Sequence, residues 1–518
     1  MSAVESWLLR SARRRPDHEA LQGLTYAALR AEVDATAARL WSAGARPGEE
    51  AGLQLPPGRP FVVALHALLR IGAIAVPLDP RLVGAERDRR LARARVLVDA
   101  AGWDALPSPS ADAVLRGEHD LDATAIVVHT SGTSGPAKPI PLTYGNWLWS
   151  ALGSAATLDC PPGERWLCAL PLNHVGGLSV LLRSAIAGTT AVVHEGWDTE
   201  RVLASLSGRL PEEGPPPTVV SVVPTTLRRL LDAGLRRSDG MALRWVLLGG
   251  ASIPAGMLEE AADAGIPVAP TYGMSEATSQ IATLGAPLFC TEVRIAGVDA
   301  SDGGGSGDGG GSEDGGGVEG GDTTGDGDRS EDGDATDAPV ATPRAASAVG
   351  PAGAGGVPRT GHEPHRATAP AGAYADPGVV GEVLVSGPTV SRAVLGEDGW
   401  LHTGDLGVLD AHGHLTIVGR TSDTIITGGE NVLPLEVERV LEADPAVAEA
   451  AAFGRPDPEW GERVCARVVP AAGATIDVDA LRAAAAAALL RHQLPREIEV
   501  VTELPRTPSG KLLRRELS

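Results

Sequence analysis

The chain has 518 residues, of which 43% are apolar, and its formal net charge at pH 7 is −22. This length is too great for one compact core and predicts at least two domains. The sequence contains no basic stripe interleaved with aromatic residues, which argues against nucleic-acid binding. The four cysteines form no C-x-x-C pair, which argues against a disulfide framework or a zinc site and suits a reducing cytoplasm.

The N-terminal region does not resemble a targeting segment. Residues 1–20 mix acidic residues with an arginine run and lack an uninterrupted apolar core, so a secretory signal is not expected. The most apolar stretch, residues 61–78, is broken by His66 and Arg70 and predicts a buried helix that runs into a strand. We therefore expect a cytoplasmic protein with no integral membrane association.

Residues 24–285 alternate short apolar runs with longer helical patterns. Strands are predicted at 95–99, 124–129, 165–170, 190–194, 219–223, 245–248 and 268–271, and helices at 224–231 and 254–264. This alternation predicts an α/β domain with largely parallel sheets. In such sheets ligands bind at the carboxyl ends of the strands.

Residues 298–372 interrupt the pattern with a segment rich in Gly, Asp, Ser, Pro and Ala. Between Asp299 and Asp337 there are 13 acidic residues and one arginine, so this stretch supplies −12 of the net charge. Because it has almost no large apolar side chains, burial cannot offset its chain entropy, and we predict a disordered acidic insert. The strand-like runs 292–296 and 381–387 on either side predict that it is a loop within a hairpin.

After Gly419 and Arg420 the pattern changes to a small α+β unit. A strand at 415–418 precedes the change, and a helix at 435–442, a strand at 464–469 and a helix at 479–492 follow it. We expect an N-terminal domain of residues 1–419, a hinge at 420–422 and a C-terminal α+β lid domain of residues 423–518.

The use of lysine is unusual. Of the 44 basic residues only Lys138 and Lys511 are lysines, and both lie in segments whose other residues suggest phosphate or catalytic chemistry. A compact ammonium differs from a planar guanidinium in reach and in hydrogen-bond geometry. These are therefore positions at which arginine is not expected to substitute.

The segment from Thr130 to Lys138 reads TSGTSGPAK and directly follows a predicted strand. Small hydroxyl and glycine residues let backbone N–H groups converge on phosphate oxygens, and the lysine adds a mobile charge. The spacing differs from G-x-x-x-x-G-K-[ST], which disfavours a Walker-type NTPase.

This segment resembles the phosphate loop of the adenylate-forming (AMP-binding) superfamily, which contains acyl-CoA synthetases, luciferases and peptide-synthetase adenylation domains. Further motifs follow in the superfamily's order: GGAS at 249–252, YGMSE at 272–276, HTGD at 402–405, GR at 419–420, GGEN at 428–431 and PRTPSGK at 505–511. The resemblance covers nearly the whole chain outside the insert. It implies an α/β fold with a large N-terminal domain of mostly parallel sheets, a small β-barrel-like subdomain and a small mobile α+β C-terminal domain.

The resemblance also implies residue roles in the adenylation of a carboxylate. The residues expected at ATP are Thr130, Ser131, Gly132, Thr133, Ser134, Gly135, Lys138, Gly249, Gly250, Ala251, Tyr272, Gly273, Met274, Ser275, Asp405 and Arg420. Glu276 and Thr133 would hold Mg²⁺. Asp405 would accept hydrogen bonds from the ribose, and the catalytic set would be Lys511, His174 and Glu276.

Longer strings are similar to the o-succinylbenzoate–CoA ligases of menaquinone biosynthesis, notably WLCALPLNH at 166–174 and YGMSEATSQIATL at 272–284. Their substrate carries a second carboxylate on an aromatic ketone, so its pocket needs a polar or cationic end. The residues expected around this substrate are His174, Arg183, Ser279 and Gln280. Arg183 is the candidate cation.

The resemblance implies that the C-terminal lid domain takes two positions, one for each step of the reaction. Lys511 would serve adenylation, whereas Gly428, Gly429 and Glu430 would line the path of the CoA thiol, with Ser422 in the hinge. The implied ligands are ATP, Mg²⁺, coenzyme A and a small carboxylic acid. The oligomeric state stays open, a homodimer being one alternative.

Three other functions remain open at this point. The first is an acyl- or aryl-CoA synthetase for a different acid, and the second is an adenylation enzyme that acts in trans on a carrier protein. The third, from a different class, is a non-catalytic nucleotide-binding protein that kept the fold. The presence of Lys138, Glu276, Asp405 and Lys511 argues against this third function.

Overall fold

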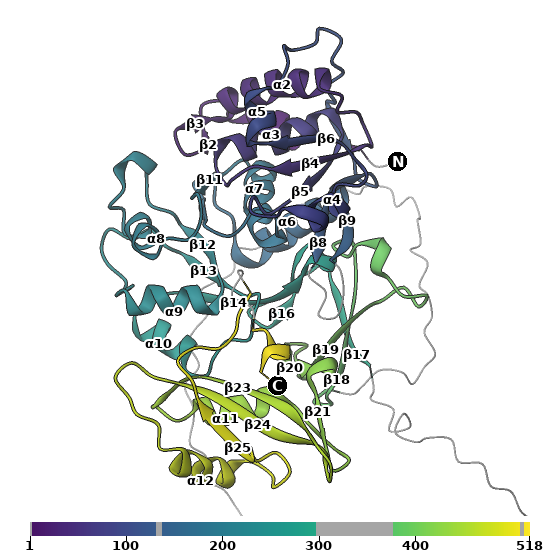
Figure 1. Cartoon of the computed structure of the whole chain (residues 1–518). Helices are drawn as coiled ribbons and strands as arrows, with labels where there is room; N and C mark the ends of the chain where they lie inside the picture. The colour runs from purple at the N-terminus through teal and green to yellow at the C-terminus, as the bar shows by residue number, and fades with distance from the viewer. Residues whose placement is uncertain (1–2, 131–136, 297–376, 508–511, 518) are drawn as a thin grey trace, which may run out of the picture. The chain divides into compact units, whose positions relative to one another are not determined.

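The computed structural model describes residues 3–130, 137–296, 377–507 and 512–517 (Figure 1). The predicted disorder of the insert therefore concerns residues outside the described ranges. Within those ranges, every helix is too short or too polar to cross a lipid bilayer.

A five-stranded sheet near the N-terminus has the order β6-β4-β5-β8-β9. Its strands are β4 (Glu50–Gln54), β5 (Ile74–Pro77), β6 (Ala94–Asp99), β8 (Thr124–Thr130) and β9 (Lys138–Thr143). Only β9 pairs antiparallel. The apolar stretch 61–78 forms α3 (Arg59–Ile71) and β5 as predicted, and Gly72 ends the helix in the left-handed region (φ 80°).

Four helices around this sheet contribute side chains to one apolar core. They are α1 (Trp7–Arg14), α2 (Tyr26–Ser42) and α5 (Ala100–Asp104) besides α3, whereas α4 (Gly84–Arg90) has no buried residue. Figure 1 shows α2, α3 and α5 beside β4 and β6. A short antiparallel pair, β1 (Ala3–Glu5) with β7 (Glu118–Asp120), ties the beginning of the chain to the segment before β8.

The second sheet has nine strands in the order β16-β15-β14-β13-β12-β10-β11-β2-β3. They are β2 (Glu19–Leu21), β3 (Leu24–Thr25), β10 (Arg165–Cys168), β11 (Thr190–Val193), β12 (Val219–Val222), β13 (Trp245–Leu248), β14 (Val268–Met274), β15 (Ser279–Thr283) and β16 (Ala286–Pro287). The strands from β14 to β2 pair parallel, whereas β3, β15 and β16 are antiparallel. The largely parallel α/β prediction is confirmed.

The helices of this second sheet explain where its core lies. They are α6 (Tyr144–Leu158), α7 (Val175–Ala187), α8 (Thr199–Leu206), α9 (Pro224–Asp232) and α10 (Met257–Asp263). One buried cluster joins α6 and α7 to strands of both sheets, and a second joins α8, α9 and α10 to β12 and β13. α6 and α7 therefore connect the two sheets through apolar contact.

Two predicted helices were too long. The helix expected at 254–264 begins only at Met257, because Gly256 takes a left-handed backbone (φ 75°) that is not helical. The helix expected at 479–492 is α12 (Val478–Ala488), after which Leu489 is extended and the Leu490 N–H donates to Oε1 of Gln493. Local side-chain hydrogen bonds of this kind compete with a helix at its end.

An antiparallel sheet of four strands follows, in the order β17 (Glu292–Ala296), β18 (Gly381–Ser386), β19 (Leu401–Leu409) and β20 (Leu415–Arg420). β17 pairs with β18 along its full length, from Glu292 with Ser386 to Ala296 with Glu382. The prediction that the acidic segment connects the two strands of a hairpin is confirmed.

The C-terminal unit has its own sheet and core. Its strands are β21 (Ile425–Thr427), β22 (Glu430–Val432), β23 (Val447–Asp457), β24 (Gly461–Pro470) and β25 (Glu497–Val500), and α11 (Pro434–Glu442) and α12 pack on them. Arg514 lies here between Asp423 and Glu438, with N···O distances of 3.1 and 2.6 Å. This α+β unit matches the predicted class.

Two buried histidines predict a loss of stability in acid. Burial lowers the pKa of His66 to about 4 and that of His119 to about 3, so both rings are neutral at pH 7. In the unfolded chain both histidines bind a proton near pH 6.5, so the free energy of unfolding falls as the pH drops below 6.5. The contribution of His66 to this fall ends near pH 4, where the folded protein binds the proton as well. We expect His66 alone to account for roughly 3 kcal/mol of this loss.

The measurement is the urea midpoint between pH 7.5 and 4.5 for the wild type and for His66→Leu, which keeps an apolar side chain of similar size. The variant should show a shallower fall over this range. Parallel curves for the two proteins would remove His66 from the explanation.

Candidate functional site

The loops of interest lie at the carboxyl ends of β13 and β14. Gly249 follows β13 directly, and a Cβ atom at this position would lie 2.6 Å from Cγ2 and 2.7 Å from the carbonyl oxygen of Thr271 on β14. Only glycine allows the two strand ends to approach this closely. Gly250 follows with φ 85°, so the backbone turns away from the sheet here and leads into Ala251.

The turn from β14 to β15 is strained and tightly packed. A Cβ atom on Gly273 would lie 1.6 Å from the carbonyl oxygen of Ser279. Thr278 and Ser279 have positive φ values of 55° and 94°, which side-chain-bearing residues rarely adopt. The buried hydroxyl of Thr278 donates to the carbonyl oxygen of Thr389 and helps hold this backbone. Strain of this kind is concentrated at functional sites.

Asp405 joins β14 to the four-stranded sheet. It is 5% exposed, its Oδ2 accepts the Tyr272 hydroxyl at 2.7 Å, and its Oδ1 accepts Nε of Arg420 at 2.5 Å. Arg420 stands opposite Asp405 in the β19–β20 register. Burial and the Asp405 charge raise the pKa of Tyr272, so its phenol stays protonated and donates. Thus the structure brings together three residues predicted to bind the nucleoside.

Glu276 presents an uncommitted carboxylate. It lies in the short 3-10 turn Ser275–Ala277 after Met274 and is half-buried, and among the described residues its carboxylate has no hydrogen bond or ion pair. The described part of the chain contains no group of three or more His, Cys, Asp or Glu side chains arranged for a metal ion. Mg²⁺ usually binds one or two carboxylates together with water and substrate phosphates, so a single Glu fits that ion.

Arg183 is a buried cation without a carboxylate partner among the described residues. It is 6% exposed on α7, its guanidinium lies 5.5 Å from the centre of the Trp166 ring, and Nη2 donates to the Ser150 hydroxyl at 3.2 Å. Its Nε has no partner within the described ranges. Burial lowers the pKa of Arg183 to about 9, which still leaves it charged at pH 7.

A hydrogen-bond relay connects Arg183 to the strained turn. Ser150 on α6 accepts from Arg183 and donates to the carbonyl oxygen of Thr278 at 2.7 Å. Gln280, 1% exposed on the adjoining β15, donates to Thr283 and leaves its own Oε1 without a partner in the described structure. The buried guanidinium and the buried amide thus keep hydrogen-bonding capacity that the described residues do not use.

His174 stands at the N-cap of α7, on the same helix as Arg183. Burial lowers the pKa of its imidazole, which favours the neutral ring at pH 7. The turn before it is close-packed, since a Cβ atom on Gly177 would lie 2.5 Å from the carbonyl oxygen of Pro171. α7 therefore carries two of the predicted substrate residues.

The remaining predicted residues are only partly described. Lys138 is exposed at the start of β9, opposite Thr130 in the register. Residues 131–136, which contain most of the predicted phosphate loop, and Lys511 lie outside the described residues. In the C-terminal unit Gly428 and Gly429 turn with φ values of 60° and 85° before Glu430, and Ser422 lies in the 3-10 turn Thr421–Asp423.

Sequence reasoning missed Ser150 and Thr278. Ser150 lies on a helix about 30 residues before Arg183, and no motif marks it. Its role depends on a long-range contact that local patterns do not encode. The indole of Trp166 was part of a quoted motif, but its position under the guanidinium was not predicted.

The profile described as "AMP-binding enzyme" matches residues 8–113 and 95–310 of this chain, and "AMP-binding enzyme C-terminal domain" matches 436–511. The chain belongs to the AMP-binding enzyme family. One relative, the 2-succinylbenzoate–CoA ligase of Bacillus licheniformis, is 33% identical over 560 residues, covering 99% of each chain.

Solved structures of the family agree. The o-succinylbenzoate CoA synthetase (MenE) of Bacillus subtilis in complex with the acyl-adenylate intermediate OSB-AMP is 29% identical, with a TM-score of 0.76 over 100% of this chain and 99% of that one. The same enzyme in complex with ATP and magnesium ion matches with a TM-score of 0.76 over 100% of both chains. The predicted fold, a large N-terminal domain followed by a smaller C-terminal one, is confirmed.

Proposed function

We propose that this chain is an AMP-forming acid–CoA ligase whose acid is o-succinylbenzoate, as in menaquinone biosynthesis. Relatives named for that activity match this chain from end to end. In the first step a carboxylate oxygen attacks the α-phosphorus of ATP and pyrophosphate leaves. In the second step the CoA thiol attacks the acyl carbon, AMP leaves with the former carboxylate oxygen, and the thiol proton passes to solvent.

The proposed nucleoside site is the group around Asp405. Its carboxylate keeps lone pairs beyond the two hydrogen bonds from Tyr272 and Arg420, so it is able to accept ribose hydroxyls. Gly249 to Ala251 would border the adenine. Lys138, with the loop 130–135, would neutralise phosphate charge that develops as pyrophosphate leaves.

Glu276 is proposed to hold Mg²⁺, together with Thr133 of the phosphate loop. The ion would supply positive charge that neutralises phosphate oxygens. Glu276 fits this role because its carboxylate has no competing partner among the described residues and follows the loop at the end of β14. A relative solved in complex with ATP and magnesium ion supports this assignment.

The observation that supports the acid most directly is the unpaired guanidinium of Arg183. o-Succinylbenzoate has a ring carboxylate in addition to the aliphatic carboxylate that is activated. A buried arginine without an acidic partner is costly unless an anion neutralises it. We assign the ring carboxylate to Arg183, with Gln280, Ser279 and His174 as further polar contacts of the acid.

The lid and its hinge follow from the same proposal. We place the hinge at residues 420–422, between the N-terminal domain 1–419 and the C-terminal domain 423–518. Lys511 is proposed to serve adenylation, and the glycine turn Gly428–Gly429 with Glu430 is proposed to line the path of the CoA thiol. Because ATP and CoA are the co-substrates, we also propose a cytoplasmic location.

A pyrophosphate-release assay with a panel of acids tests this function. We expect release with o-succinylbenzoate and ATP–Mg²⁺, and formation of the thioester only when CoA is added. Preference for a fatty or simple aromatic acid would assign a different acyl-CoA synthetase. No release with any acid would support a binding protein without catalysis.

Arg183→Met should raise the KM for o-succinylbenzoate about 10- to 100-fold while leaving the KM for ATP within about twofold. A hydrogen bond to a charged group contributes about 1.5–3 kcal/mol, which corresponds to this range. The matched substrate is 4-oxo-4-phenylbutanoate, which keeps the reacting carboxylate and lacks the ring carboxylate.

The wild type should discriminate strongly against 4-oxo-4-phenylbutanoate, and Arg183→Met should lose most of that discrimination. Because the comparison uses two acids on one folded protein, partial misfolding of the variant does not mimic the result. Unchanged discrimination would remove Arg183 from the acid pocket.

A further inference from the structure

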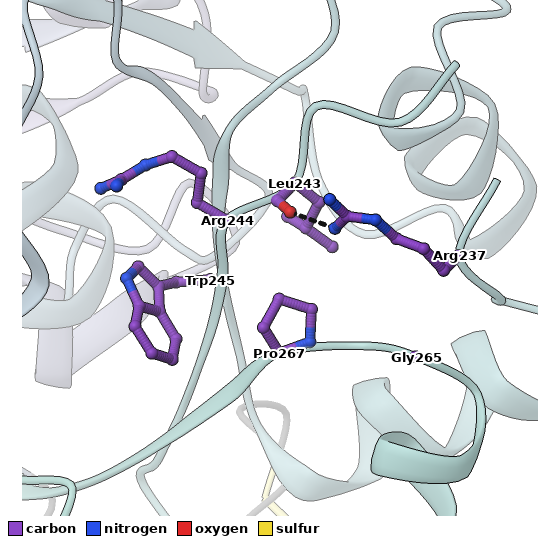
Figure 2. Close-up of a pocket in the computed structure, with 6 residues that line it drawn as sticks. All are labelled: Arg237, Leu243, Arg244, Trp245, Gly265 and Pro267. Carbon is purple, nitrogen blue, oxygen red and sulfur yellow. Dashed lines mark hydrogen bonds between the residues drawn. The ribbon is translucent and has the colours of Figure 1, made fainter. Parts of the chain in front are cut away.

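Two adjoining hollows lie at the edge of the nine-stranded sheet formed by the amino ends of its parallel strands, opposite the edge that carries the proposed active site. One, of about 520 Å³, is lined by Leu203, Ser207, Arg209, Ala233, Gly234, Arg236, Arg237 and Ser238. The other, of about 430 Å³, is lined by Arg237, Leu243, Arg244, Trp245, Gly265 and Pro267 and is drawn in Figure 2. They share Arg237, and both are shallow and open to solvent.

Their position separates them from the site described above. Trp245 opens β13 and Pro267 immediately precedes β14, whereas Gly249 and Tyr272 lie at or beyond the other ends of these parallel strands. A four-residue strand is about 13 Å long. The hollows are therefore at the amino ends of the strands, and the proposed adenylation residues are at the carboxyl ends.

The lining is strongly basic although the chain is acidic. The two hollows together present four arginines, and no carboxylate lines either of them. Arg209 and Arg236 are exposed, and within the described ranges neither side chain makes a hydrogen bond or ion pair. The net charge of the chain is −22, but the lining of the hollows is positively charged and contains no acidic residue. Such a local positive charge favours the binding of an anion.

Arg237 is held in place at the centre of the group. Its backbone N–H donates to Ala264 at 2.9 Å, and Nη1 donates to the carbonyl oxygen of Leu243 at 2.5 Å, the bond marked in Figure 2. Gly265 (φ 72°) packs so closely that a Cβ atom there would lie 2.9 Å from Cβ of Arg237. One guanidinium N–H group satisfies the carbonyl, which leaves the others to bind a ligand.

The second hollow adds an aromatic wall. The Trp245 N–H donates to the carbonyl oxygen of Leu158 at 3.1 Å, which fixes the indole. Arg244 forms an ion pair with Glu164 at 3.3 Å and donates to the carbonyl oxygens of Leu158 and Asp159. Its charge is therefore already paired, and it lines the hollow without offering a free cation. The free cations are thus at the end lined by Arg209 and Arg236, and the apolar surface is at the Trp245 end.

We propose that these hollows form a second anion site, which binds a compact multivalent phosphate through Arg209, Arg236 and Arg237. Guanidinium groups match phosphate oxygens in geometry and form charge-assisted hydrogen bonds. The site is independent of the adenylation reaction. Two sources share this chemistry, namely inorganic pyrophosphate and the bisphosphate portion of a nucleotide.

The test is titration calorimetry on the full chain, without Mg²⁺ and with EDTA, with the adenylation site filled by an acyl-sulfamoyl adenosine that carries no phosphate. We expect pyrophosphate to bind to the wild type at one equivalent. Arg209→Ala/Arg236→Ala should weaken this binding at least about tenfold, from the loss of two charge-assisted contacts. The matched control is Arg229→Ala, since Arg229 is an exposed arginine of α9 that does not line either hollow.

Absence of binding to the wild type would overturn the proposal, as would equal weakening in Arg229→Ala, which would indicate only general charge attraction. Undiminished binding to the double variant would overturn it as well. A second arm uses adenosine 3′,5′-bisphosphate. Binding tighter than pyrophosphate by about tenfold, with the advantage lost in Trp245→Leu, would identify a nucleotide as the source. Equal binding of both would identify the inorganic anion.

Discussion

Lys511→Ala should reduce acyl-adenylate formation by about two to three orders of magnitude, while thioester formation from preformed acyl-adenylate stays within about threefold of wild type. Removing one group that stabilises transition-state charge has an effect of this size. Lys511 is one of only two lysines in the chain, and adenylation is the step in which charge accumulates on the phosphates. The second step starts after pyrophosphate has left and does not need that ammonium.

The two half-reactions are measured separately, by pyrophosphate release and by thioester formation from synthetic o-succinylbenzoyl-AMP and CoA. Lys511→Arg is the informative companion, because it keeps the charge and changes the geometry. We expect it to recover little of the lost rate. An equal loss of both half-reactions in Lys511→Ala would contradict the proposed division of work between two lid arrangements.

Gly273→Ala should eliminate measurable adenylation and destabilise the protein by about 3 kcal/mol or more, the range of strained or overpacked buried positions. The new methyl group would lie 1.6 Å from the carbonyl oxygen of Ser279, so the β14–β15 turn has to open. Opening it displaces Tyr272 and the Glu276 turn, which the proposed mechanism places at the nucleotide.

Gly163→Ala is the matched control, because a Cβ atom there meets no atom within 4 Å. Its thermal midpoint and rate should equal those of the wild type. Adenylation by a folded Gly273→Ala at the wild-type rate would show that the turn does not position the reacting groups.

Much of the fold was predictable because its patterns are local. The strand at 245–248 was predicted to the residue, since four apolar residues before a Gly-Gly turn leave few alternatives. The stretch 61–78 carried both its helical spacing and the glycine that ends the helix. The family motifs added the order of the loops, which local propensity does not provide.

What escaped prediction depends on contacts between distant residues. The sequence suggested Arg183 as a candidate cation for the acid, and this remains a prediction; it gave no sign that Ser150 and Trp166 would contact the guanidinium, because these lie on two other elements. The ends of α10 and α12 were misjudged where one backbone conformation or one side-chain hydrogen bond outweighed helix propensity. The basic hollows were missed because Arg209 lies in the segment after α8, whereas Arg236, Arg237 and Arg244 lie in the connection between α9 and β13, and no local pattern brings these two segments together.

The hairpin of β17 and β18 has a practical consequence for engineering. Its strands pair from Glu292 with Ser386 to Ala296 with Glu382, so their register is set by their own hydrogen bonds and not by the 84 residues, 297–380, that join them. Closure entropy rises only with the logarithm of loop length, so shortening this connection to a tight turn changes the free energy by about 3 kcal/mol. The native connection between β17 and β18 can therefore be replaced by a reporter or affinity module.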